Sequence, residues 1–237
     1  LLFSGDIKYE KSWLFDAATV RFPRADTLVI ESTYGGPQDF QPNRVDATQE
    51  IQDLIKLAVS RSGKVFCPVF AVGRSQEVML AIDQLFKSGD VSPVTVWLDG
   101  MISEATAIHA SHPDFLNRDL RRQVLKGGEE NPFNSPWFKQ VDSREQRESI
   151  INDPSPCIVL ATSGMMTGGP IMEYFKNWAP ELNNTLCFVG YQASGTLGRR
   201  LQSGHPEVPL VDRGQTHMIP VACNVVTIDG FSGHSDR

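Results

Sequence analysis

The sequence predicts an α/β fold with a mostly parallel sheet, on the basis of two observations. Five short apolar runs are separated by stretches of helical period, which is the order of successive βαβ units. The helices between the runs imply a sheet that is covered on both faces. In such folds ligands bind outside the carboxyl ends of the strands, so a functional site is expected there.

The expected elements follow in chain order. Residues 27–33, TLVIEST, are typical of a buried strand that ends in polar groups. Residues 44–61 predict a helix whose apolar face is formed by Val45, Ile51, Leu54, Ile55 and Ala58. Further strands are expected at 63–70, 93–100, 138–141, 156–164 and 184–191, and helices at 75–86, 101–111, 144–152 and 169–178. Residues 129–138 predict a loop, and residues 218–230 a β-rich element in a different layer.

The composition restricts the class of protein. With 41% apolar residues, a chain of 237 residues can bury a substantial core. The formal net charge of -6 lacks the electrostatic footprint of non-specific nucleic-acid binders, so a nucleic-acid site must be local. No apolar run reaches the roughly 18 residues of a membrane span, and no membrane is expected among the partners. The chain begins within an apolar run, and we expect it to be a fragment of a longer protein.

The four cysteines, at positions 67, 157, 187 and 223, have no paired short spacing. This spacing favours free thiols in a reducing cytoplasm over a disulfide framework or a Cys-type zinc site. We therefore expect a cytoplasmic protein.

Glycine and hydroxyl residues follow the expected strands one after another. The segments are SGD, ESTYGG, FAVGRSQE, LDGMISE, ATSGMMTGG and GYQASGTLGRR. Such turns leave backbone N–H groups bare near helix starts, which is how loops hold phosphate groups. Taken singly, none is specific. SGMMTGG lacks the lysine of a P-loop, no G-x-G-x-x-G follows the first strand, and a tight turn with helix capping explains each segment as well.

Taken together and in order, six segments carry a resemblance to a known family: SGDIKYE, ESTYGG, PVFAVGRSQE, ATSGMMTGGP, GYQASGTLGRR and DGFSGHSDR. They resemble the metallo-β-lactamase nucleases with a β-CASP insert, and within them the archaeal homologues of the endonuclease subunit of the cleavage and polyadenylation specificity factor. The resemblance implies a two-zinc hydrolase core, interrupted by a Rossmann-like β-CASP cap, that cleaves single-stranded RNA in RNA 3'-end processing or decay. Residues 1–36 and 216–237 would then belong to the metallo-β-lactamase domain, and residues 37–215 to the β-CASP domain.

The resemblance also implies roles for three residues. Asp6 matches the carboxylate that bridges the two zinc ions, and a carboxylate can share its oxygens between two cations. Glu31 and His234 match a hydrogen-bonded pair that donates a proton to the leaving 3' oxygen or stabilises the scissile phosphate. A carboxylate neighbour favours the imidazolium form, which suits a general acid near neutral pH. Without the resemblance, each residue also fits a plain structural role, as a turn Asp, a solvated Glu and a non-catalytic His.

The family's other zinc ligands are missing from the sequence. Neither its His-x-His-x-Asp-His run nor its two further histidines is present, since the five histidines are His109, His112, His205, His217 and His234. We expect His109 and His112 on a helix face. This chain alone is therefore expected to bind zinc poorly and to be inactive, with a longer parent as the enzyme.

Four residues are candidates for RNA binding. Arg74 and Arg199 follow strand ends, where a guanidinium can fork onto phosphate oxygens, and the backbone N–H groups of Ser163 and Gly164 add donors. An ion pair within the cap, for example with Glu77, explains each arginine equally well. Other residues suit either a structural role or a role as an RNA track or stacking platform: Arg118, Arg121, Arg122, Lys126, Tyr34 and Tyr191.

Two other classes of protein stay open at this point. A non-catalytic scaffold subunit of an RNA-processing complex would keep the fold without the activity. A Rossmann-like nucleotide-binding module is suggested by the βαβ order alone, and the missing dinucleotide fingerprint counts against it. The parent could also form a homodimer.

Overall fold

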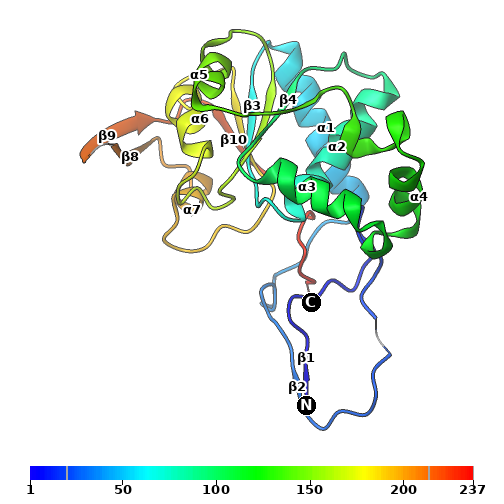
Figure 1. Ribbon diagram of the computed structural model, residues 1–237. Helices are drawn as coiled ribbons and strands as arrows, with labels where there is room; N and C mark the ends of the chain where they lie inside the picture. The colour runs from blue at the N-terminus through cyan, green and yellow to red at the C-terminus, as the bar shows by residue number, and fades with distance from the viewer. Residues whose placement is uncertain (20, 213, 237) are drawn as a thin grey trace.

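The body of the molecule is a six-stranded sheet. The computed structural model describes residues 1–19, 21–212 and 214–236, and each neighbouring pair of strands in the sheet is parallel. The strand order is β10, β7, β3, β6, β4, β5 (Figure 1). The strands are β3 (Val65–Pro68), β4 (Val96–Asp99), β5 (Phe138–Gln140), β6 (Ile158–Ala161), β7 (Thr185–Phe188) and β10 (Asn224–Thr227). The predicted α/β class with a parallel sheet is confirmed.

Helices cover both faces of this sheet because successive strand residues point to opposite sides. On β3, Val65 and Cys67 belong to one hydrophobic cluster, whereas Phe66 between them belongs to another. The first cluster includes side chains of α1 (Arg44–Ser60), α2 (Arg74–Ser88), α3 (Ile102–Ser111) and α4 (Arg118–Lys126). The second includes side chains of α5 (Arg144–Asn152), α6 (Ile171–Trp178) and α7 (Leu197–Gln202). Single 3-10 turns lie at Pro113–Phe115, Gly128–Glu130 and Pro132–Asn134.

Three sequence-based expectations are wrong. Residues 27–33 were expected to form a buried strand, but β2 comprises only Leu28–Val29 and is exposed, because its partner is the equally short β1 (Leu2–Phe3) below the body (Figure 1). Val45 lies in the first turn of α1 and is exposed, so it is not part of the apolar face. Residues 218–230 do not share one separate layer. β9 (Gln215–Pro220) pairs with β8 (Glu207–Asp212) in a protruding hairpin, whereas β10 joins the main sheet beside β7.

Two extended segments project from the body, the N-terminal arm (residues 1–19 and 21–43) and the C-terminal arm (residues 229–236). Figure 1 shows both arms below the sheet, with the C-terminal arm beside the upper part of the N-terminal arm. They are joined by hydrogen bonds from the Ser235 N–H to the Ile7 carbonyl, at 2.8 Å, and from the Tyr9 N–H to the Ser235 hydroxyl, at 2.7 Å. The two arms, which are far apart in the sequence, therefore build one local structure.

Asn117 fastens the N-terminal arm to the helices. Its side-chain oxygen caps α4 by accepting from the backbone N–H groups of Asp119 and Leu120. Its side-chain nitrogen donates to the carbonyls of Ser12, at 3.2 Å, and Trp13, at 2.6 Å. One side chain thus fixes both the start of a helix and the course of the arm. Of the helices described, none has the length and hydropathy to cross a bilayer.

Candidate active-site cleft

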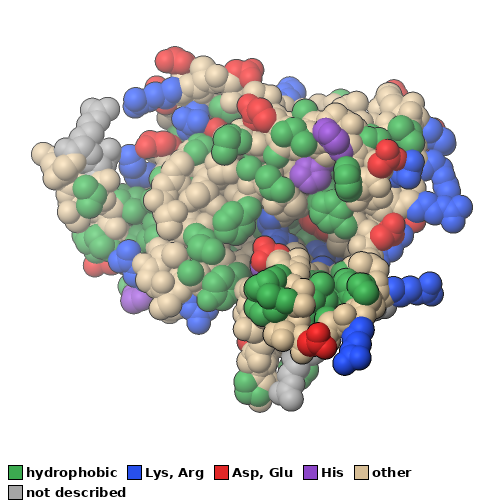
Figure 2. All heavy atoms as spheres, turned by 60° about the horizontal axis from the view of Figure 1, so that its bottom comes forward, with side chains coloured by type: hydrophobic (Ala, Val, Ile, Leu, Met, Phe, Trp, Pro, Cys, Tyr) green, Lys and Arg blue, Asp and Glu red, His purple; other side chains and the backbone are tan. Residues whose placement is uncertain are grey.

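A cleft of about 840 Å³ opens where the two arms meet the body. Its walls come from both arms, from the starts of α1 and α2, and from the loops that follow β3, β6 and β7. Figure 2 looks onto this side of the molecule, where the arms project toward the viewer in front of the body. Since β7, β3 and β6 are adjacent strands, the cleft lies at the carboxyl edge of the sheet, where the fold class predicts a site.

Glu31 and His234 meet at this cleft. His234 lines it, and its Nδ1 lies 2.9 Å from Oε1 of Glu31 and 3.3 Å from the Thr33 hydroxyl. Both side chains are largely shielded from water, with 13% of Glu31 and 26% of His234 exposed. The structure therefore brings together two predicted site residues that are 203 positions apart in the sequence.

The contact with Glu31 determines which ring nitrogen of His234 is available for proton transfer. An ionised carboxylate only accepts hydrogen bonds, so Nδ1 must carry the hydrogen that it donates to Glu31. The exchangeable proton then resides on Nε2. This arrangement lets the imidazole give or take a proton through one defined atom.

Hydrogen bonds keep Glu31 ionised. Burial alone would raise the pKa of Glu31, but hydrogen bonds from the Thr33 hydroxyl, from the N–H groups of Ile7 and Thr33, and from His234 outweigh it and lower the pKa to about 2. The carboxylate is thus negative throughout the physiological pH range.

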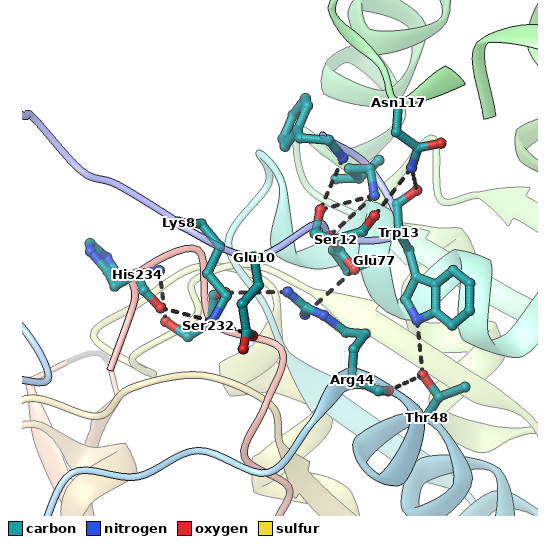
Figure 3. Close-up of polar contacts among 12 residues, drawn as sticks. Lys8, Glu10, Ser12, Trp13, Arg44, Thr48, Glu77, Asn117, Ser232 and His234 are labelled. Carbon is teal, nitrogen blue, oxygen red and sulfur yellow. Dashed lines mark hydrogen bonds and ion pairs between the residues drawn. The ribbon is translucent and has the colours of Figure 1, made fainter. Parts of the chain in front are cut away.

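The backbone at His234 is held from two sides (Figure 3). Its N–H donates to the Ser232 hydroxyl at 3.0 Å, and its carbonyl accepts from the Lys8 ammonium at 3.4 Å. Lys8 in turn lies 3.7 Å from a carboxylate oxygen of Glu10. These contacts join the two arms beside the imidazole, so its position depends on both ends of the chain.

Asp6 lines the same cleft and is exposed. A zinc ion needs about four ligands around one point, with two or three of them histidines in most hydrolases. Within the described ranges, however, no three His, Cys, Asp or Glu side chains gather to form a metal site. The described residues therefore do not fit a zinc centre by themselves.

Arg74 also lines the cleft, at the first position of α2. Gly73 precedes it with φ of +78°, a backbone conformation that favours glycine, and so lets the chain turn from β3 into the helix. Burial lowers the pKa of Arg74 to about 10, and the nearby positive charge of Arg44 adds to this effect. Glu77, which the sequence suggested as an ion-pair partner, instead lies 3.5 Å from Arg44.

Arg44 is the site residue that the sequence reading missed. It is the first residue of α1, and it reaches the cleft because α1 starts where the N-terminal arm ends. Its guanidinium contacts Glu77 and donates to the Ser232 carbonyl at 3.4 Å (Figure 3). No motif marks it. An arginine at a helix start opposes the helix dipole, and this unfavourable placement is the only local signal.

The other predicted RNA contacts lie away from the cleft lining. The Ser163 N–H already donates to the Gly168 carbonyl within its own loop, and the carbonyl of Gly164 accepts from Gln192. Arg199 lies exposed on α7. The structure therefore groups Arg74 with His234 in the cleft lining, whereas Arg199 is exposed outside it, Ser163 is half-buried and Gly164 is buried beside the cleft residue Met165.

The fold and the cleft define an α/β cap domain whose two ends complete a polar site. A family model described as the Beta-Casp domain matches residues 75–201, more than half of the chain, so the chain belongs to the β-CASP family. The matched residues lie inside the predicted β-CASP range of 37–215, and the exact domain boundaries stay a prediction.

The chain is similar to proteins named transcription termination factor FttA. It is 52% identical to the protein of Methanosarcina mazei, 49% to that of Methanocaldococcus jannaschii and 47% to that of a Lokiarchaeum strain. Each match covers 100% of this chain and 37% of the relative, so the chain spans just over a third of the length of these relatives. The names of these relatives refer to transcription termination, and they do not support the predicted role in mRNA 3'-end processing.

Proposed function

We propose that this chain is the β-CASP part of an endoribonuclease that hydrolyses single-stranded RNA, and that the full-length protein uses this cleavage in transcription termination in the cytoplasm. The contact between Glu31 and His234 carries the proposal. A buried carboxylate that orients an imidazole toward a cleft is an arrangement for moving a proton, and a binding scaffold has no need of it. The names of the relatives support the link to termination.

The proposed reaction assigns one step to His234. Water adds to the phosphorus and releases one proton to solvent, the bond to the 3' oxygen breaks, and the leaving oxygen takes the proton from Nε2 of the imidazolium. Glu31 holds the ring through Nδ1 and balances its charge before the transfer. The neutral imidazole that remains regains a proton from solvent.

RNA is proposed to enter through the cleft, with Arg74 binding a phosphate group. Arg199 and the turn of Ser163 and Gly164 are proposed to contact the strand further along its path. In the full-length protein we propose a two-zinc centre that supplies positive charge next to the scissile phosphate. Asp6 would be one of its ligands, and the others would come from outside these 237 residues.

The test compares cleavage of an end-labelled single-stranded RNA by the full-length protein, by its His234→Ala variant and by a His205→Ala control. His205 is exposed and distant from the cleft lining. We expect internal cuts by the parent and the control, and a loss of at least about 100-fold for His234→Ala, as removal of a general acid typically causes. A parent that binds RNA without cutting it would favour the scaffold alternative, and equal rates for all three proteins would assign His234 a structural role.

A further inference from the structure

Two arginines share one buried carboxylate at the base of the cleft. Arg44 and Arg74 both line it, and Glu77 is the carboxylate that acts on both of them. Arg44 is 12% exposed and Glu77 is 6% exposed, so neither charge is well solvated. Glu10 also acts on Arg44, but it is 74% exposed, so Glu77 is the one buried carboxylate against the two guanidinium groups.

Arg74 has no anion of its own. Among the described residues, none gives its guanidinium a hydrogen bond or a salt bridge, and its Nε is buried without a partner. The Nε atom faces Gly190, where a β-carbon would lie 3.5 Å away. A buried charge without a partner is costly, so a position like this is normally explained by a ligand.

Arg44 is held in place, and its pairing with Glu77 is loose. It contacts Glu77, donates to the Ser232 carbonyl and lies 5.7 Å above the ring centre of Phe231. Its Nη1 nevertheless has no hydrogen-bond partner. That Nη1 is the atom 3.5 Å from Oε2 of Glu77, and Oε2 has no hydrogen-bond partner either, so the two charges attract without a hydrogen bond between them. The guanidinium is therefore fixed in position while its charge is only loosely paired, which suits a preorganised anion site.

The imidazole of His234 belongs to the same wall. The Tyr34 ring lies 6.4 Å from the ring of His234 and 6.2 Å from that of Tyr191, and the charge of Arg74 acts on the Tyr34 hydroxyl. The positive end of the α2 dipole lies at Arg74 and adds to the attraction for an anion.

We propose that Arg44 and Arg74 together bind one phosphate group of the RNA strand beside the His234 site, and that Glu77 limits the affinity of this subsite by neutralising half of its charge. The identity of the anion as an RNA phosphate rests on the proposed function. The anion subsite itself rests on the unpaired guanidinium of Arg74 and on the loosely paired guanidinium of Arg44 beside it.

The proposed subsite predicts that substitutions of its arginines and of Glu77 change RNA affinity in opposite directions. Arg74→Gln and Arg44→Gln should each weaken RNA binding about tenfold or more, because a charged hydrogen-bond donor is lost. Glu77→Gln should tighten binding, because the amide can still accept from the Leu14 N–H but no longer neutralises the arginines. Arg61→Gln, at the other end of α1 and exposed, is the matched control and should leave affinity unchanged.

The experiment measures binding of a fluorescent 12-nucleotide single-stranded RNA to the full-length protein in a His234→Ala background, between 50 and 200 mM KCl. Loss of one phosphate contact should lower the slope of log affinity against log salt by about 0.7 in Arg74→Gln. Arg74→Gln should also unfold at the same or a higher temperature than its parent without RNA, because an uncompensated charge has been removed. A purely structural arginine would lower the unfolding temperature instead.

A second arm does not depend on RNA. Sodium phosphate, compared with sodium chloride at equal ionic strength, should stabilise the parent and the Arg61→Gln control more than Arg74→Gln. Equal stabilisation of all three proteins, or equal RNA affinity of Arg74→Gln and Arg61→Gln, would overturn the subsite. A positive phosphate arm in a protein that binds no RNA would instead overturn the proposed function and leave the subsite standing.

Discussion

The sheet body and the two arms are stabilised in different ways. In β3 and β6 every residue is buried, and the side chains pack into two hydrophobic clusters. In the arms many large apolar side chains are exposed, and individual polar contacts such as that of Asn117 fix the course of the chain. The arms place only a few side chains, such as Leu14 and Phe231, in the core, yet Asp6, Glu31 and His234 all come from them. The proposed chemistry therefore depends on the part of the molecule that is less buried.

The largest expected effect is a loss of unfolding free energy when a large side chain is truncated, and this loss should differ between the body and the arms. Phe175 on α6 is fully buried, so Phe175→Ala should lower the free energy of unfolding by about 3 to 5 kcal/mol. Phe3 in the N-terminal arm is 66% exposed, and Phe3→Ala should change it by no more than about 0.5 kcal/mol. Urea unfolding of the two variants measures both values. Similar losses would mean that the arm contributes to the core as much as the sheet does.

The next effect concerns the attachment of the arm. Asn117→Asp keeps the oxygen that caps α4 but replaces the donor to the carbonyls of Ser12 and Trp13 by a second oxygen. We expect a loss of about 1 to 3 kcal/mol from the repulsion and the unmet carbonyls, with faster amide exchange in residues 12–16. Exchange in α4 should change little. Exchange that speeds up equally in α4 and the arm would show that the two are not separable.

The smallest effect is a pH dependence of stability. The pKa of Glu31 is lowered from 4.5 to about 2 in the folded protein, so its contribution is present above about pH 4.5 and is lost as pH falls toward 2. A Glu31→Gln variant should therefore show a flatter fall of unfolding temperature between pH 5 and pH 3. Parallel curves for the two proteins would contradict the strong hydrogen bonding of this carboxylate.

Most of the body could be predicted from the sequence because its elements follow simple periodicities. The helix at Arg44–Ser60 and the strands at Val65–Pro68 and Ile158–Ala161 lie within the predicted ranges. The arms have no periodicity, so the reading of 27–33 as a buried strand failed: an apolar run shows that burial is possible, but it does not say what lies over it.

The site was predictable only in part, for a similar reason. The motifs around Glu31 and His234 carry a family resemblance, and the structure brings the two side chains together. Arg44 lies in no motif, and its role emerges only where α1, α2 and the C-terminal arm converge on Glu77 and Ser232. Charge balance at such a junction is a property of the folded chain and cannot be read from spacing.

The central claim is that Glu31 and His234 act as one unit. The most direct test measures RNA cleavage rates of the full-length protein with Glu31→Gln, with His234→Ala and with both changes. If the carboxylate acts through the imidazole, the double variant should be no slower than His234→Ala alone. If the two losses multiply instead, each residue acts on the reaction independently, and the proposed role of Glu31 in orienting His234 is wrong.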